Sequence, residues 1–317
     1  MRLLVAALLV ASPAAAQTHV LVACGLGGEP RYQAAFLATG LAVAAAFEER
    51  LSVPRSNIRL LAEDPSRNTA VAAQSTKQEI EQSLAAMAGR AEPGATIVIV
   101  LVGHGSVGPD GPRINLPGPD LTAGEFAALL APFGTRPVVV VNAASASGDW
   151  VPALAGPGRV VLTATRSSRE REETRFGRHF AAALASDDAD DDKDGRLSAL
   201  EVFDYASREV ARGYERDQHL RTEHALLDAD GDGVGTMEPV ATGGDGAMAA
   251  TVYLGGAGAG VPLTGLAAVK DSLEREVARL RGRKAAMEPA EYERQLENLL
   301  LELARVSREL RAGEGRR

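Results

Sequence analysis

Two segments of the sequence end in side chains that could carry out covalent chemistry. An apolar run at 96–102 leads, after one glycine, into His104 and Gly105, and a second run at 137–141 leads into small residues that include Ser145. An imidazole beside a hydroxyl is the minimum set of groups for acyl transfer, because the imidazole can accept the proton that the hydroxyl releases. Neighbouring strands of a parallel sheet end at the same edge, so we expect both side chains to face one crevice.

The stretch DDDKDGRLSALE, residues 190–201, has the pattern of a calcium-binding EF-hand loop. The oxygen donors at its positions one, three, five, seven, nine and twelve are Asp190, Asp192, Asp194, the carbonyl of Arg196, Ser198 and Glu201. Gly195 at position six allows the sharp turn that such a loop needs. We therefore predict that this loop binds Ca²⁺, against the simpler interpretation of a solvated acidic loop.

A second stretch, DADGDGVGTMEP at 228–239, repeats only the first half of that pattern. Its oxygen donors are Asp228, Asp230, Asp232 and the carbonyl of Val234. Position twelve is Pro239, and Glu238 falls one residue early. We expect a weaker calcium site here, or one that another segment of the chain completes. The two loops start 38 residues apart, which is compatible with a pair and with two separate clips.

Five near-continuous apolar runs predict strands that are buried on both faces, as in a parallel sheet. They lie at 19–24, 57–62, 96–102, 137–141 and 159–165. Helical patterns separate several of them, at 33–52, 76–90 and 122–133. This alternation predicts an α/β fold with a doubly wound, mostly parallel sheet flanked by helices.

After the last of these runs the character of the chain changes. Helices are expected at 176–185 and 199–215, and the short apolar piece at 249–254 could return as a further strand. Towards the C-terminus an apolar stripe with alternating three- and four-residue steps predicts a helical hairpin over 261–317. The hairpin is either a packing element or a seam through which the protein forms a homo-oligomer.

The N-terminus has one basic residue, an apolar run and an alanine-rich end, which is typical of a secretory signal peptide cut near Ala16. We therefore expect a secreted or periplasmic protein, without a membrane span in its mature part. The predicted division is a signal peptide at 1–16, an α/β domain at 17–260 with a calcium-loop insertion at about 186–246, and the hairpin at 261–317.

Composition argues against several classes of function. The net charge of −8, without a basic cluster, disfavours nucleic acid and anionic lipid as partners. Cys24 is the single cysteine, so an intrachain disulfide is impossible. No G-x-S-x-G motif surrounds Ser145, so a nucleophile-elbow hydrolase is not expected.

The two strand-ending motifs, IVIVLVGHGS and VVVVNAASASG, resemble those of the caspase–haemoglobinase fold and, within it, of the legumain-like peptidases. In that family one apolar strand ends in His-Gly-Ser and a later one in Ala-Cys-x-Ser-Gly. The segment VPRSNIRLLAED at 53–64 is also similar to the start of legumain, and the resemblance covers roughly residues 18–185. It implies His104 as the catalytic imidazole and the Gly105 N–H as part of an oxyanion hole.

The resemblance leaves the nucleophile position open between two residues. Matching the Ser-Gly pair puts Ser145 at the family's cysteine, whereas matching the strand end puts Ala144 there. Either way the sulfur is missing, and a serine hydroxyl, unlike a thiolate, needs a base within hydrogen-bond reach. Two functions follow: a peptidase that acts through Ser145, and an inactive relative that holds a peptide or protein partner.

Overall fold

The computed structural model describes residues 17–255 and 287–314, together with scattered helical residues between 266 and 280. The predicted signal peptide at 1–16 and most of the first helix of the predicted hairpin lie outside these residues. Within the described part of the chain, no helix is both long enough and apolar enough to cross a membrane.

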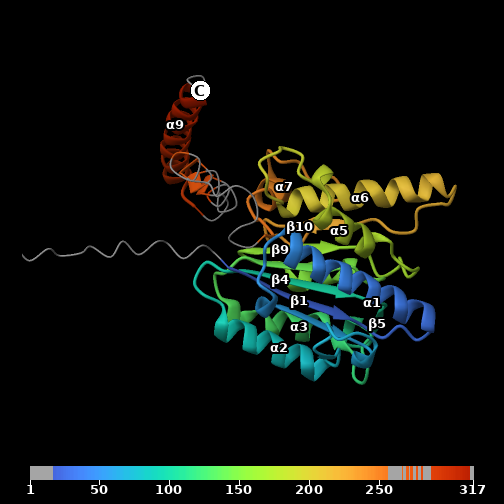
Figure 1. Cartoon of the computed structure of the whole chain (residues 1–317). Helices are drawn as coiled ribbons and strands as arrows, with labels where there is room; N and C mark the ends of the chain where they lie inside the picture. The colour runs from blue at the N-terminus through green and yellow to red at the C-terminus, as the bar shows by residue number, and fades with distance from the viewer. Residues whose placement is uncertain are drawn as a thin grey trace, which may run out of the picture.

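A seven-stranded sheet forms the centre of the molecule (Figure 1). Its order is β10-β9-β8-β4-β1-β2-β3, and all neighbours pair in parallel except β10, which is antiparallel to β9. The strands are β1 (Thr18–Cys24), β2 (Ile58–Ala62), β3 (Ala73–Gln74), β4 (Thr96–Val102), β8 (Val138–Asn142), β9 (Arg159–Thr163) and β10 (Leu226–Asp228). All five predicted strands are present, and the mostly parallel sheet is confirmed.

The chain leaves the middle of the sheet in two directions. From β1 it runs outward to β2 and β3, then crosses back to β4 and continues to β8 and β9 on the other side. The direction reverses between β1 and β4, and ligands of such sheets bind outside the carboxyl ends of the strands at this point. Strands β4 and β8 pair directly, with Leu101 opposite Asn142, so the loops that carry His104 and Ser145 leave from neighbouring strands.

Helices cover both faces of the sheet (Figure 1). One side holds α1 (Pro30–Ala45), α5 (Phe176–Ala185) and α6 (Ala199–Arg216), and the other holds α2 (Lys77–Arg90), α3 (Ala123–Leu129) and α4 (Val151–Leu154). Alternate residues of one strand serve the two cores: Val20 and Val22 of β1 face the first, and Leu21 and Ala23 face the second. The strands are continuously apolar because both of their faces are buried.

The predicted helices are present with adjusted ends. A π-helical turn at Ala46–Arg50 continues α1, and a 3₁₀ turn at Ala131–Phe133 follows the shorter α3. A capping box between Thr122 and Glu125 starts α3, as the sequence indicates. Further 3₁₀ turns lie at Arg55–Asn57, Pro65–Arg67, Gly148–Trp150 and Asp187–Ala189.

A three-stranded antiparallel sheet follows His104 and was not predicted from the sequence. It consists of β5 (Gly105–Gly108), β6 (Gly111–Ile114) and β7 (Leu121–Thr122). These strands are rich in glycine, which has a low propensity for strands, so local sequence gives little sign of them. Tertiary pairing creates them, and the N–H of Asn115 anchors them to the His104 carbonyl at 2.9 Å.

The possible strand at 249–254 does not form. The helix α7 (Gly244–Ala249) takes its beginning, and Tyr253 makes only an isolated bridge to Ser198. The sheet edge that such a strand would need is already occupied by β10. The segment pairs instead with the first acidic loop, where the N–H of Leu254 donates to the Leu197 carbonyl at 2.9 Å.

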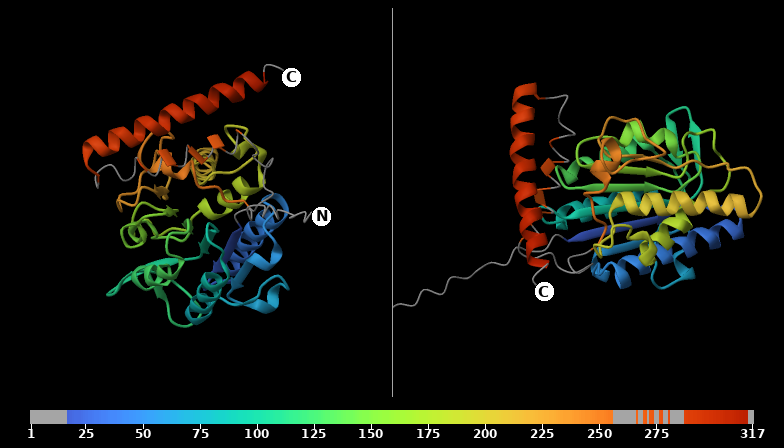
Figure 2. Two further views of the ribbon diagram at one scale, coloured as in Figure 1. Left: turned by 90° about the vertical axis from the view of Figure 1, so that its left-hand side faces the viewer. Right: turned by 90° about the horizontal axis from the view of Figure 1, so that it is seen from above.

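The C-terminal helix α9 (Pro289–Glu314) lies at the end of the molecule opposite the carboxyl ends of the strands (Figures 1 and 2). Its residues Tyr292 and Val306 are buried. Leu300 and Leu301 are exposed. This helix is therefore remote from the crevice at the strand ends.

Candidate functional site

The ends of β4 and β8 are in direct contact. The backbone N–H of Gly105 donates a hydrogen bond to the Ser145 hydroxyl oxygen at 3.2 Å. Directly after β8, the Asn142 side-chain oxygen accepts the N–H of Ala144 at 3.2 Å and turns the chain. The structure thus brings together the two strand ends in which the sequence indicates an imidazole and a hydroxyl.

The chain is so crowded here that only small residues fit. A Cβ atom on Gly105 would lie 2.2 Å from the carbonyl oxygen of Ser145. A Cβ atom on Gly148 would lie 2.2 Å from the carbonyl carbon of Arg166. Both distances are far below any van der Waals contact, so the two glycines are required by the close approach of other backbone segments.

Two further features hold the loop after Ser145. The Ser147 hydroxyl accepts the backbone N–H groups of residues 164 and 165, beyond the end of β9, at 3.1 and 3.2 Å. Ala146 has a φ of 55°, a left-handed conformation that costs a non-glycine residue about 1 kcal/mol. Its N–H donates to the Glu170 carbonyl at 2.8 Å, which keeps the backbone in that conformation. Ser147 is therefore an anchor of the loop.

Neither candidate for the nucleophile position is exposed. Ser145 is 2 % exposed and Ala144 is 1 % exposed. The Ala144 side chain belongs to the second apolar core, whereas the Ser145 hydroxyl meets the Gly105 N–H. Of the two alignments, this geometry favours Ser145, because its oxygen and not the methyl group of Ala144 faces the β4 end.

The His104 ring packs against α1. Its centroid lies 4.7 Å from that of Tyr32 and 4.9 Å from that of Phe36, both edge-on. No hydrogen bond joins this imidazole to the Ser145 hydroxyl, so the base that a serine nucleophile requires is not in place. Burial lowers the pKa of His104 below 6.5, while the negative charges of Glu173 and Glu29 act in the opposite direction. The imidazole is therefore mostly neutral at pH 7.

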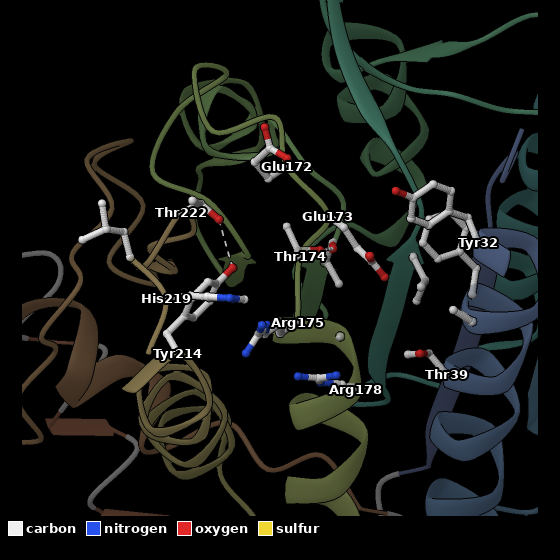
Figure 3. Close-up of a pocket in the computed structure, with 16 residues that line it drawn as sticks. Tyr32, Thr39, Glu172, Glu173, Thr174, Arg175, Arg178, Tyr214, His219 and Thr222 are labelled. Carbon is white, nitrogen blue, oxygen red and sulfur yellow. Dashed lines mark hydrogen bonds between the residues drawn. The ribbon is translucent and has the colours of Figure 1, made fainter. Parts of the chain in front are cut away.

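A cavity of about 630 Å³, shown in Figure 3, lies at the carboxyl edge of the sheet. Val102 at the end of β4 and Ala143 just after β8 line it, and so does Tyr32, which also contacts His104. Neither His104 nor Ser145 is among its lining residues. The cavity therefore reaches the two strand ends, but His104 and Ser145 are not part of its wall.

Charged side chains of both signs face this cavity (Figure 3). Two glutamates at 172–173 come from the loop before α5, and Arg175 and Arg178 come from its start. The Arg175 guanidinium is held 2.6 Å from Asp217 and stacks 4.2 Å above the Tyr214 ring. The cavity therefore presents both positive and negative charges.

A buried glutamate positions the wall of this cavity. Glu223, which is 2 % exposed, accepts the N–H of Arg175 at 2.7 and 2.9 Å and that of Phe176 at 3.1 Å. A second contact joins the loop before α5 to the segment that carries Glu223: the Glu170 carboxylate lies 2.7 Å from Nδ1 of His224. Sequence reasoning missed these residues, because Glu223 and the start of α5 are 48 residues apart in the chain and carry no motif.

The first acidic loop is compact. Three carboxylates cluster in it, with one oxygen of each within 4.8 Å of the others: Asp190, Asp192 and Asp194. One oxygen of Glu201 caps α6 together with Ser198, and the other accepts the N–H of Asp191 at 2.9 Å. Gly195 makes the turn with a φ of 79°, and the guanidinium of Arg196 lies over the Tyr253 ring. The donor set fits a hard divalent cation such as Ca²⁺.

The second acidic loop gathers its carboxylates in the same way. Again one oxygen of each of three carboxylates lies within 4.8 Å of the others: Asp228, Asp230 and Asp232. The two loops have different backbone partners: Leu197 of the first bonds to Leu254, whereas Leu227 before the second pairs with Thr236. The two acidic loops are therefore separate and do not hydrogen-bond to each other as a pair. Glu238 is exposed.

Comparison with known proteins does not assign a family to this chain. No protein-family model and no curated protein matches the sequence. Among solved structures, protein GSU0716 from Geobacter sulfurreducens is similar, with a TM-score of 0.43 and 15 % sequence identity. The match covers 61 % of this chain and 89 % of that one.

The contact between the two strand ends predicts the effect of a single methyl group. Gly105→Ala should lower the free energy of unfolding by about 1–3 kcal/mol, because the new Cβ atom meets the backbone oxygen of Ser145. The matched control is Gly124→Ala in α3, where a Cβ atom has no neighbour within 4 Å. The control should leave stability unchanged or raise it by up to about 1 kcal/mol. Urea denaturation measures both, and equal effects would contradict the contact.

The environment of His104 predicts the direction of a pKa change. Glu173→Gln removes a negative charge that favours the imidazolium, so it should lower the pKa of His104 further below 6.5. Proton NMR titration of the imidazole measures this. Because the folded state binds this proton less readily than the unfolded chain, His104 reduces stability as the pH falls below about 6.5, and more so in the variant. A rise in the pKa would show that Glu173 does not act on this ring.

Proposed function

We propose that this protein is a legumain-like relative with the caspase–haemoglobinase fold that holds a peptide or protein at the carboxyl edge of its sheet without cleaving it. The main support for this proposal is the burial and hydrogen bonding of the Ser145 hydroxyl. It is 2 % exposed, bonded to the Gly105 N–H and not bonded to His104. A serine hydrolase needs this oxygen open to the substrate and within reach of a base.

The hydrogen bond from Gly105 supports the same proposal. The resemblance gives this N–H a role in an oxyanion hole, where donors must be free to meet the oxygen on which charge develops. In this protein the Gly105 N–H already donates to the Ser145 hydroxyl, so it is not free for such an oxygen. The pairing of β4 with β8 supports the resemblance itself, because it places the two motifs on neighbouring strands.

The cavity beside His104 supports a peptide or protein as the partner. Its walls combine two glutamates with Arg175 and Arg178, so they offer partners to the carboxylates, ammonium groups and amides of a peptide. Its volume of about 630 Å³ is in the usual range for ligand sites. The net charge of −8 argues against nucleic acid.

A serine peptidase is the second candidate, favoured by the closeness of Gly105 and Ser145. In that reaction the Ser145 oxygen attacks the peptide carbonyl carbon while His104 takes the hydroxyl proton. The proton then passes to the leaving amine as the C–N bond breaks, and water hydrolyses the acyl ester. This route requires the His104 ring to leave Tyr32 and Phe36 and turn toward Ser145.

We further propose that the protein is exported and that Ca²⁺ stabilises it at the loop 190–201. Three clustered carboxylates repel one another in the absence of a cation, and Ca²⁺ would neutralise them. The role is structural, because Glu201 joins the loop to the first turn of α6.

Active-site labelling distinguishes the two candidates. With Ca²⁺ present, a fluorophosphonate probe should not label the wild-type chain and peptide libraries should not be cleaved. Ser145→Ala and His104→Ala serve as background controls and should behave like the wild type. Labelling of the wild type that both variants lose would replace the binding proposal with the peptidase.

Calcium titration tests the first loop. Asp190→Ala combined with Glu201→Ala should abolish the tighter binding event in calorimetry, because it removes two of the ligands. Asp188→Ala is the matched control, since Asp188 is acidic and exposed but lies outside the ligand positions. A tight event that survives the double substitution would assign the site elsewhere.

A further inference from the structure

The second acidic loop finds, in space, the carboxylate that its own sequence lacks. Asp245, on the first turn of α7, is 8 % exposed, and its Oδ1 accepts the N–H groups of Ala229 at 2.8 Å and Asp230 at 3.2 Å. These two N–H groups belong to loop positions two and three.

In the first loop the same two positions meet the residue at position twelve. The Oε1 of Glu201 accepts the N–H groups of Asp191 at 2.9 Å and Asp192 at 3.4 Å. Asp245 therefore bears the same relation to the second loop as Glu201 bears to the first. Glu238, which the sequence places one residue before position twelve, is exposed.

A separate observation points to a ligand at the second loop. Asp228 is completely buried, and its Oδ2 accepts the N–H of Gly233 at 2.7 Å. Its Oδ1 is also buried and has no hydrogen-bond partner in the described part of the chain. In the first loop the corresponding oxygen of Asp190 accepts the N–H of Asp194. A buried carboxylate oxygen without a donor is costly unless a cation meets it.

The charges around Asp228 leave this oxygen without compensation from the protein. Asp230, Asp232 and Asp245 surround it, and no ion pair joins any of these four residues to a lysine or arginine among the described residues. A divalent cation would satisfy both the lone oxygen and the excess negative charge.

We infer that Asp228, Asp230, Asp232 and the Val234 carbonyl form a second Ca²⁺ site with Asp245, which replaces the missing ligand at position twelve. All five donors are hard oxygens, which suit Ca²⁺, and water would complete the six to eight ligands that this ion takes. The cation ties the end of β10, the antiparallel edge strand, to α7. The inference deepens the calcium part of the proposed function and does not depend on the peptidase or binding role.

Calorimetric titration of the mature full-length chain with CaCl₂ tests the inference. In the Asp190→Ala, Glu201→Ala background only the second site should remain. Adding Asp245→Asn, which keeps an oxygen for the two N–H groups, should weaken the remaining event at least about tenfold. Adding Glu238→Gln, the matched control, should leave it unchanged. Absence of the event in the background, or loss caused by the control and not by Asp245→Asn, would overturn the assignment.

A measurement on the wild-type chain covers the case in which a variant does not fold. Crystals soaked in Tb³⁺ should show an anomalous peak among Asp228, Asp230 and Asp232, with Asp245 as a ligand. A peak at 190–201 alone overturns this inference and leaves the first calcium site standing. Peaks at neither loop overturn both.

Discussion

Parallel pairing of β4 with β8 decides which loops meet at the carboxyl edge of the sheet. Five consecutive residue pairs, from Ile97 with Val138 to Leu101 with Asn142, fix the register of the two strands. Both strands are buried on both faces, so a slip of one residue would move every side chain into the opposite core and disrupt the packing of both cores. The loops beyond them must therefore meet, and the contact between Gly105 and Ser145 follows from that register.

The tight contact between the loops after β4 and β8 leaves no space for a ligand between them. The loops are packed tightly enough to exclude a Cβ atom at Gly105, and the Ser145 hydroxyl is enclosed between them. The open space lies to the side, where α1, the loop before α5 and the end of α6 surround the cavity. That wall depends on Glu223, whose buried carboxylate takes the N–H groups at the start of α5. The proposed binding role for this cavity is consistent with both features.

The acidic loops show a different use of charge. Each concentrates carboxylates where a helix or a strand ends, and each is joined by hydrogen bonds to a carboxylate on the helix that follows it. In the first loop this carboxylate, Glu201, lies in the loop's own sequence. In the second it is Asp245, on α7, beyond a further turn of the chain. Without a cation both clusters are electrostatically unfavourable, so bound metal and stability would be linked.

Several features could be predicted from the amino-acid sequence: the five central strands, their parallel arrangement, most helices, the two strand ends with His104 and Ser145, and the first acidic loop. These features are local: apolar runs, helical periodicity and a twelve-residue spacing are properties of contiguous residues. Other features become visible only in the folded chain: the glycine-rich sheet after His104, the burial of Ser145, the packing of His104 on α1, and the contacts of Glu223 and Asp245. Each of these depends on contacts between segments far apart in the chain, and no local pattern in either segment specifies its partner.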